Sequence, residues 1–282
     1  MKLKILGSES MGVRSYSTFI ETYDLRIIID PGCALGPKRF NLPPHKLEVV
    51  TLWNTWRNIN KYLKKSNAAI ISHYHYDHHH YRNAKFYEGK IVFVKNTLNL
   101  NLYQKKRAET FFKALGDSCK IIIADEKTFQ FGNTSITFTM PVPHGFSGAG
   151  AEVIGVYIKD ENSSLFYTSD ISGILEHNMV DFLIKRRIDT MIFDGFPTYL
   201  LGSKVKKESL DESIYTLKIL IRECKINTLV IDHHSARDKD WESYYEEIFS
   251  LNTLKFVGTS ASIDGSRPQY LEARRRSLFF CE

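Results

Sequence analysis

Short apolar runs bounded by polar or turn-forming residues recur along the chain and predict β-strands. In the first half these runs lie at 2–6, 17–21, 25–30, 68–72, 91–94 and 121–124. In the second half they lie at 135–140, 153–159, 165–168, 190–193 and 228–231. Only short turns separate the first three runs, which favours antiparallel pairing there because parallel neighbours need long crossovers.

Apolar positions spaced three or four residues apart predict amphipathic helices. The clearest is 46–65, and further helices are predicted at 104–115, 179–185, 209–223, 241–250 and 268–280. Trp53 and Trp56 are interpreted as core residues of the first helix, in preference to a platform for stacking bases. Strands that alternate with helices, with no repeat or linker between them, indicate one large α/β domain spanning 1–282.

Composition excludes few classes of function. Hydrophobic residues make up 43% of the 282 positions and charged residues 25%, which is ordinary for a globular protein. We recognise no run of transmembrane length and no signal peptide, so we expect a cytoplasmic protein without a membrane partner. The net charge of +6 would help to attract an anionic substrate but is too small to indicate nucleic-acid binding by itself. The basic run at 105–107 is expected on a solvated helix face, with a substrate-facing patch as the alternative, and the run at 274–276 is expected on a solvated surface.

The four cysteines give no sign of a metal knuckle or a disulfide framework. They are far apart and contain no Cys-x-x-Cys pair: Cys33, Cys119, Cys224 and Cys281. We therefore expect reduced thiols.

The strongest chemical signal follows the run at 68–72. Five of the ten histidines lie within residues 73–80, together with Asp77. Side chains two positions apart on an extended backbone point the same way, so His73 and His75 can bind one cation. Asp77 and His78 follow where the chain turns and can reach a second cation. Zinc, manganese, iron and cobalt all accept such nitrogen and oxygen ligands.

Later segments supply further candidate ligands. His144 lies in the proline- and glycine-rich segment 141–150 and is expected to be the third ligand of the first ion. Asp170 follows a predicted strand, and its two oxygens could bridge both ions. One of His233 and His234 should complete the second site, and we favour His233 because it lies nearer to its strand.

Other polar residues near these segments have two interpretations each. Asp30 ends the run at 25–30 and either holds the metal-binding loop by hydrogen bonds or is an ordinary turn aspartate. His79, His80 and Tyr199 are candidates for contacting the substrate and for protonating its leaving group. For Tyr199, packing within its loop is an equally good explanation.

Together these residues resemble the metallo-β-lactamase superfamily. The motif His-x-His-x-Asp-His at 73–78 is followed in order by His144, Asp170 and either His233 or His234. In more detail the chain resembles an uncharacterised archaeal family of predicted hydrolases in this superfamily. That resemblance spans nearly the whole chain and rests on Ser-Glu-Ser-Met-Gly-Val-Arg-Ser at 8–15, Asp-Pro-Gly at 30–32 with 34–39, the histidine motif, 197–200 and 232–234.

The resemblance implies a four-layer αββα sandwich with the metals at one edge of two sheets. It also implies a hydrolase with two divalent ions, zinc being expected and manganese or iron being alternatives. In that reaction a hydroxide shared by the ions attacks the substrate, with Asp77 and Asp170 as catalytic residues.

A phosphodiester, small or at a nucleic-acid end, is the favoured substrate. The opening Leu6-Gly7-Ser8 is similar to the start of the phosphodiesterase and transfer-RNA-processing branches of the superfamily. We find no long inserted domain like the one that caps its larger ribonucleases. An acyl hydrolase acting on thioesters or lactones is one alternative, and a non-catalytic metal-dependent binding protein is another. No protein partner can be inferred.

Overall fold

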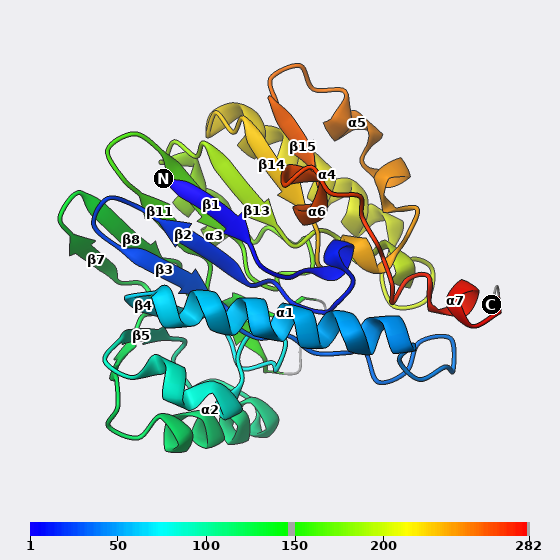
Figure 1. The fold of residues 1–282 in the computed structure, drawn as a ribbon. Helices are drawn as coiled ribbons and strands as arrows, with labels where there is room; N and C mark the ends of the chain where they lie inside the picture. The colour runs from blue at the N-terminus through cyan, green and yellow to red at the C-terminus, as the bar shows by residue number, and fades with distance from the viewer. Residues whose placement is uncertain (146–149, 281–282) are drawn as a thin grey trace.

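Two β-sheets lie face to face between two layers of helices in the computed structural model, which describes residues 1–145 and 150–280 (Figure 1). The first sheet has the strand order β1-β2-β3-β4-β5-β6, and the second has the order β15-β14-β13-β12-β11-β8-β7. Helices α1 and α2 cover the first sheet, and α3 and α4 cover the second. The expected fold class, a four-layer αββα sandwich, is thus confirmed.

The first sheet combines an antiparallel start with a parallel remainder. Its strands are β1 (Lys2–Ile5), β2 (Thr18–Glu21), β3 (Arg26–Ile29), β4 (Ala68–Ile71), β5 (Ile91–Val94) and β6 (Lys120–Ile123). Strands β1, β2 and β3 pair antiparallel, as predicted. From β3 to β6 the pairing is parallel, because helical crossovers carry the chain back. The helical elements of this half are η1 (Glu9–Met11), α1 (Lys46–Lys65), η2 (Tyr81–Tyr87) and α2 (Leu102–Leu115).

The second sheet is antiparallel on one side and parallel on the other. Its strands are β7 (Thr128–Phe131), β8 (Thr134–Phe138), β11 (Val156–Lys159), β12 (Ser164–Tyr167), β13 (Thr190–Phe193), β14 (Thr228–Ile231) and β15 (Phe256–Gly258). A separate ribbon pairs β9 (Val142–Pro143) with β10 (Glu152–Val153). The helical elements are α3 (His177–Ile184), η3 (Thr198–Leu200), α4 (Lys207–Glu223), η4 (Ser235–Arg237), η5 (Trp241–Tyr244), α5 (Glu246–Phe249), α6 (Ser260–Ile263) and α7 (Arg275–Phe280).

Three apolar clusters correspond to the three interfaces between layers. Ile27 and Ile29 of β3 pack between the two sheets, whereas Ile28 packs on the other face, in the cluster that contains Ile59 of α1. Successive side chains of a strand point to opposite faces, so a strand covered on both sides must be apolar throughout. This explains why the central strands are continuous apolar runs in the sequence.

Several predicted elements differ from the structure. The segment 153–159 is divided between β10 and β11, and β7 and β15 were not predicted. In place of a helix over 241–250, the chain forms η5 and then α5. Only α7 is helical in 268–280, because tertiary contacts hold the preceding residues: the backbone N–H of Gln269 donates to the carbonyl of Ser10.

Two predictions about surface and core are wrong at one residue each. Arg275 is fully buried and pairs with Glu48, although the basic run at 274–276 was expected on a solvated surface. Trp53 is 60% exposed, so it is not a core residue of α1. Trp56 is half-buried and packs against the core beneath α1.

The described cysteines are free thiols: Cys33, Cys119 and Cys224. Cys281 lies outside the described residues, as do positions 146–149 of the segment 141–150. Among the described helices, none combines the length and the apolar composition needed to cross a bilayer.

Candidate metal centre

The candidate ligands meet at the carboxyl ends of parallel strands. Strands β3 and β4 are parallel neighbours in one sheet, and β12, β13 and β14 are parallel neighbours in the other. Parallel strands end at the same edge, so the loops that leave them lie together. Three residues in these loops have positive φ angles: Asp30 (46°), Ser169 (61°) and His233 (52°). Such backbone is sparsely populated outside glycine and clusters at functional sites.

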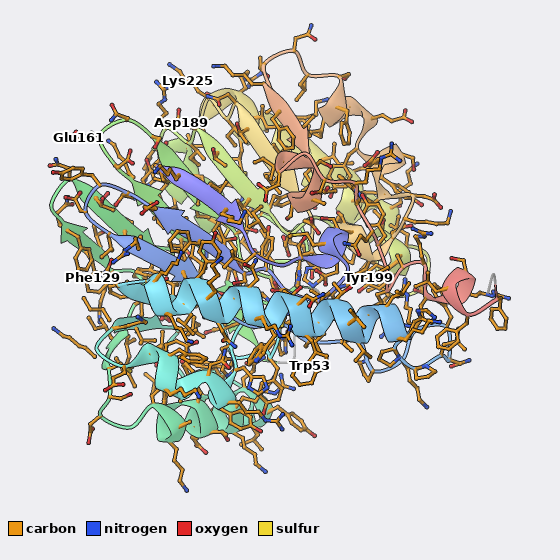
Figure 2. The ribbon with its side chains drawn as sticks, in the orientation of Figure 1. Trp53, Phe129, Glu161, Asp189, Tyr199 and Lys225 are labelled. Atoms are coloured by element: carbon orange, nitrogen blue, oxygen red, sulfur yellow. The ribbon has the colours of Figure 1, made fainter. Side chains whose placement is uncertain are left out.

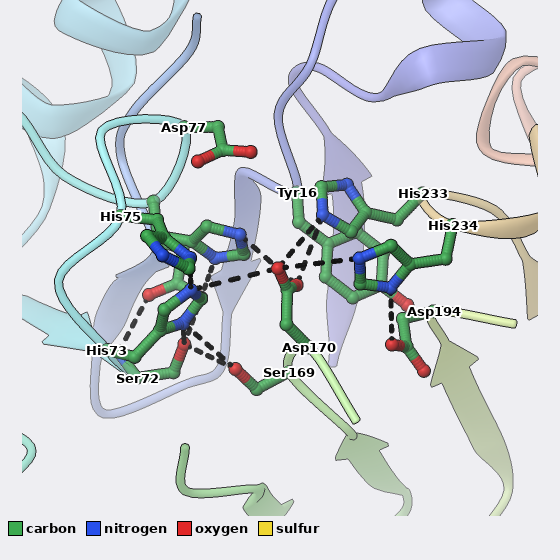
Figure 3. Close-up of polar contacts among 12 residues, drawn as sticks. Tyr16, Ser72, His73, His75, Asp77, Ser169, Asp170, Asp194, His233 and His234 are labelled. Atoms are coloured by element: carbon green, nitrogen blue, oxygen red, sulfur yellow. Dashed lines mark hydrogen bonds and ion pairs between the residues drawn. The ribbon is translucent and has the colours of Figure 1, made fainter. Parts of the chain in front are cut away.

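A first group of ligand atoms comes from four of the predicted residues. One atom from each of His73, His75, His144 and Asp170 lies within 4.8 Å of the others. Nε2 of His73 is 3.0 Å from Nδ1 of His75, and Nε2 of His144 is 3.3 Å from Oδ2 of Asp170. Figure 3 shows the Asp170 carboxylate pointing between His73 and His75 on one side and His233 and His234 on the other.

A second group shares the same carboxylate. Ligand atoms of Asp77, His78 and His233 lie within 4.8 Å of one another. Oδ1 of Asp170 is 3.1 Å from Nε2 of His78 and 3.1 Å from Nε2 of His233. Nε2 of His234 lies 3.9 Å from Oδ2 of Asp170, so both histidines reach the centre, with His233 nearer. The group that contains Asp77 includes His233 and not His234.

These side chains offer the ligand atoms that divalent cations need. Nε2 of His78 and Oδ1 of Asp170 are buried and lack a well-formed hydrogen bond. Buried polar atoms normally find a partner, so such atoms converging on one point indicate a ligand. Imidazole nitrogens with carboxylate oxygens form a donor set that suits zinc, iron or manganese.

The charge state of the cluster agrees with a site built for cations. Burial, together with the neighbouring His144, lowers the pKa of His75 to about 3, so its imidazole is neutral. Burial opposes the charged form of His233 too, yet the carboxylates of Asp170 and Glu9 raise its pKa to about 10. Without a metal, these carboxylates therefore keep His233 protonated. A bound cation can take the place of that proton and its positive charge.

Three buried acids orient the imidazoles from behind. Asp30 accepts hydrogen bonds from Nδ1 of His78 at 2.8 Å and from the backbone N–H of Ser72 at 2.8 Å. Nδ1 of His233 donates to Glu9 at 2.7 Å. Nδ1 of His234 donates to Asp194 at 2.8 Å. A partner on Nδ1 sets the tautomer and turns Nε2 toward the metal, as carboxylates commonly do for histidine ligands.

Sequence reasoning left open whether Asp30 supports the metal-binding loop or is a turn aspartate, and it missed the roles of Glu9, Asp194 and Arg237. Asp194 directly follows the apolar run at 190–193, just as Asp30 follows Ile29. An acidic residue at the end of a predicted strand was therefore a signal that could have identified Asp194. Glu9 carried no such signal, because its partner His233 is distant in the sequence. The guanidinium of Arg237 lies 3.2 Å from Nε2 of His233 and 3.9 Å from Oδ2 of Asp77, and it pairs with Glu9 at 2.8 Å.

The three candidate substrate contacts occupy different surroundings. His79 is fully buried; its Nδ1 contacts the carbonyl of His75 and its ring packs on Phe111, so it does not face solvent. His80 is partly exposed at the start of η2. Tyr199 is partly exposed and stacks with the guanidinium of Arg39, whose carbon is 4.5 Å from the ring centroid.

Replacing Asp30 by asparagine should weaken metal binding by about 10- to 100-fold, the usual effect of losing an outer partner of a histidine ligand. The amide cannot accept from His78 and Ser72 as the carboxylate does. Competition with a chromophoric chelator would measure the affinity. Asp211→Asn, an exposed acid on α4, is the matched control. Equal affinities in the two variants would contradict this role of Asp30.

Comparison with known proteins gives close relatives and a shared fold. The chain is 39% identical over 283 residues to a UPF0282 protein of Korarchaeum cryptofilum, covering 99% of this chain and 94% of that one. It is 38% identical over 289 residues to a UPF0282 protein of Saccharolobus islandicus, covering 99% and 93%. No family model matches the chain.

Solved structures with low sequence identity share the architecture. The metallo-β-lactamase fold protein YhfI from Bacillus subtilis superposes with a TM-score of 0.55 at 14% identity, covering 91% of this chain and 94% of that one. A diphosphatase of the PhnP family gives 0.51 at 15% identity, covering 91% and 92%. The short form of human tRNase Z gives 0.51 at 11% identity, covering 83% and 92%. The chain thus has the metallo-β-lactamase fold.

Proposed function

Since the chain belongs to the UPF0282 protein family and has the metallo-β-lactamase fold, we propose that it is a hydrolase that uses two divalent metal ions to cleave phosphodiesters. The observation that carries this proposal is the position of Asp170. Its carboxylate oxygens lie 3.1 to 3.3 Å from imidazole nitrogens of both ligand groups: His78 and His233 on one side and His144 on the other. A carboxylate placed between two sets of nitrogen ligands is the arrangement that a two-metal site requires.

Each side chain has a defined task in this proposal. His73, His75 and His144 would hold one ion, Asp77, His78 and His233 the other, and Asp170 both. Bound there, zinc or a similar ion would supply Lewis acidity and lower the pKa of water toward neutrality. Asp30, Glu9 and Asp194 keep the imidazoles oriented.

Asp77 and Arg237 face the reacting groups. The side chain of Asp77 is 16% exposed, so its carboxylate can orient a water molecule by accepting a hydrogen bond from it. Burial opposes the charged form of Asp77, but the positive charge of His78 outweighs this and holds the pKa of Asp77 below its usual range. The guanidinium of Arg237, 3.9 Å from Asp77, offers a fixed positive charge to an anionic substrate.

Phosphodiesters are favoured over acyl compounds because of the cations on this side of the centre. Arg39 donates to the backbone carbonyl of Arg237 at 3.1 Å and stacks on Tyr199, so a second cationic side chain reaches the segment that carries Arg237. Guanidinium groups recognise phosphate oxygens through paired hydrogen bonds. The diphosphatase and tRNase Z that share the fold act, by their names, on phosphate compounds, which agrees with this choice.

We expect the metal-loaded protein to hydrolyse bis(p-nitrophenyl) phosphate faster than p-nitrophenyl acetate or a homoserine lactone. Release of nitrophenolate and opening of the lactone are the measured quantities. EDTA should abolish the activity, and added zinc or manganese should restore it. Faster turnover of the ester or lactone would favour an acyl hydrolase, and full metal content without turnover of any substrate would favour a binding protein.

A further inference from the structure

A cavity of about 480 Å³ lies between α1 and η2, beside the metal-binding loop. We call it the Trp53 pocket. Its walls include Trp53, Trp56, Asn60, His80, Arg82 and Asn83. It combines aromatic, amide and cationic groups, so its lining is not simply apolar.

The aromatic wall comes from one face of α1. Trp53, Trp56 and Asn60 are spaced three and four residues apart, so they lie on the same side of the helix. Trp53 is 60% exposed, and Figure 2 shows it projecting from the lower edge of α1. Trp56 meets the ring of His80 edge to face, with 5.0 Å between ring centroids. An exposed indole offers a flat surface on which another planar ring can stack.

Two amide atoms of the pocket are buried without a hydrogen-bond partner in the described chain. They are Nδ2 of Asn83, a side chain only 2% exposed, and Oδ1 of Asn60. A buried donor and a buried acceptor each cost stability when they are left unpaired. A ligand that fits would therefore offer an acceptor and a donor along one planar edge, as a nucleobase does.

The pocket adjoins the metal centre and its mouth is basic. His80 follows His78 by two residues, so their Cα atoms are at most about 7 Å apart. Cys33 also lines the pocket; burial raises the pKa of its thiol, and the charge of Asp77 raises it further, so this part of the lining lies near Asp77. Arg82 and Lys85 line the pocket and are exposed, so they can contact phosphate oxygens.

We propose that the Trp53 pocket binds an unpaired nucleobase of a nucleotide or a nucleic-acid end, and that the adjoining phosphodiester lies at the metal centre. The second part rests on the proposed function. The base stacks on Trp53, and its edge pairs with Asn83 and Asn60. A base inside a duplex is already stacked and paired, so the pocket selects single-stranded ends.

Binding without turnover tests the pocket by itself. In EDTA, titration calorimetry compares AMP with ribose 5-phosphate, which carries the same phosphate on a sugar but lacks the base. We expect AMP to bind more tightly to the full-length protein. Trp53→Ala should weaken AMP binding by roughly 5- to 100-fold, as removal of a stacking aromatic residue does in single-strand binding proteins. Trp53→Phe should retain most of the affinity.

Two further variants separate binding from folding. Asn83→Leu should weaken AMP binding without lowering the midpoint of thermal unfolding, because Nδ2 of Asn83 loses no hydrogen bond. Tyr23→Ala, which removes a fully exposed aromatic ring at the β2–β3 turn, should leave AMP binding unchanged.

The outcomes distinguish this inference from the proposed function. The proposal that the pocket binds a base would be refuted if AMP and ribose 5-phosphate bind equally well. It would also be refuted if the Trp53→Ala variant binds AMP as tightly as the unmodified protein does. Either result would count even if bis(p-nitrophenyl) phosphate is hydrolysed. If binding depends on the base and Trp53→Ala abolishes it, the base-binding role of the pocket is supported even if no phosphodiester is cleaved. In that case only the proposed hydrolase function would be refuted.

Discussion

Replacing Asp170 by alanine or asparagine is expected to lower hydrolytic turnover by more than about 100-fold, the upper end of the loss seen when only an outer partner of a metal ligand is removed. Among the described residues, Asp170 is the carboxylate that contacts both ligand groups. Its Oδ1 is 3.1 Å from His78 and from His233, and its Oδ2 is 3.3 Å from His144. In the proposed two-metal site, its loss would therefore remove a ligand from both ions at once.

The Asp170 variants should lose bound metal without losing their fold. Elemental analysis should find fewer than two ions per chain in the Asp170 variants, while circular dichroism should find the fold intact. Asp181→Asn, an exposed acid on α3, should retain its metal and activity and serves as the control. An Asp170→Ala protein with two bound ions and full turnover would refute the bridging role.

Replacing Arg275 by alanine is expected to lower the free energy of unfolding by about 3 to 5 kcal/mol, the cost of breaking a buried ion pair from one side. Arg275 is fully buried, and two of its guanidinium nitrogens donate to Glu48 at 2.7 Å each. It also donates to the carbonyls of Gly36 and Leu42. The substitution leaves Glu48 charged, buried and short of partners.

The Arg275–Glu48 pair connects the start of α1, the loop that contains Gly36 and Leu42, and the C-terminal segment. Glu48 accepts from the backbone N–H of His45 at 2.8 Å and so caps α1, while Arg275 holds the C-terminal segment against it. Urea unfolding followed by circular dichroism would measure the loss. Arg276→Ala, which changes an exposed neighbour, should have little effect. If both variants unfold at the same urea concentration, the pair contributes little to stability.

A double replacement by apolar residues tests the physical cause. Glu48→Leu combined with Arg275→Met leaves no unpaired charge in the interior. We expect it to be more stable than Arg275→Ala alone, because the largest cost of the single change is the uncompensated carboxylate. If the double variant is the less stable one, packing and backbone contacts of Arg275 dominate instead.

Much of the fold was predictable because its signals are local. The helix at 46–65 and the strands at 91–94, 190–193 and 228–231 were predicted with the bounds that the structure has. Each depends on apolar residues only a few positions apart. The irregular segment before Arg275 was not predictable in this way, because contacts with remote residues hold it.

In the candidate site, too, local signals were predictable and contacts between remote residues were not. The ligands between His73 and His78 follow one strand, so their spacing alone indicates shared metal chemistry. His144, Asp170 and His233 were predicted from their positions near strand ends, and the structure brings His144 and Asp170 into a ligand group with His73 and His75, and His233 into one with Asp77 and His78. Their roles as ligands stay predictions that metal analysis would test.

The sequence by itself determined which side chains are candidate metal ligands and that they lie near the ends of strands, because both depend on neighbours close along the chain. Only the tertiary structure decided which groups support and surround those side chains. Glu9 and its partner His233 are 224 residues apart, and Arg275 and Glu48 are 227 apart. Such pairs form only when two sheets and their helices pack together, so spacing along the chain carries no trace of them.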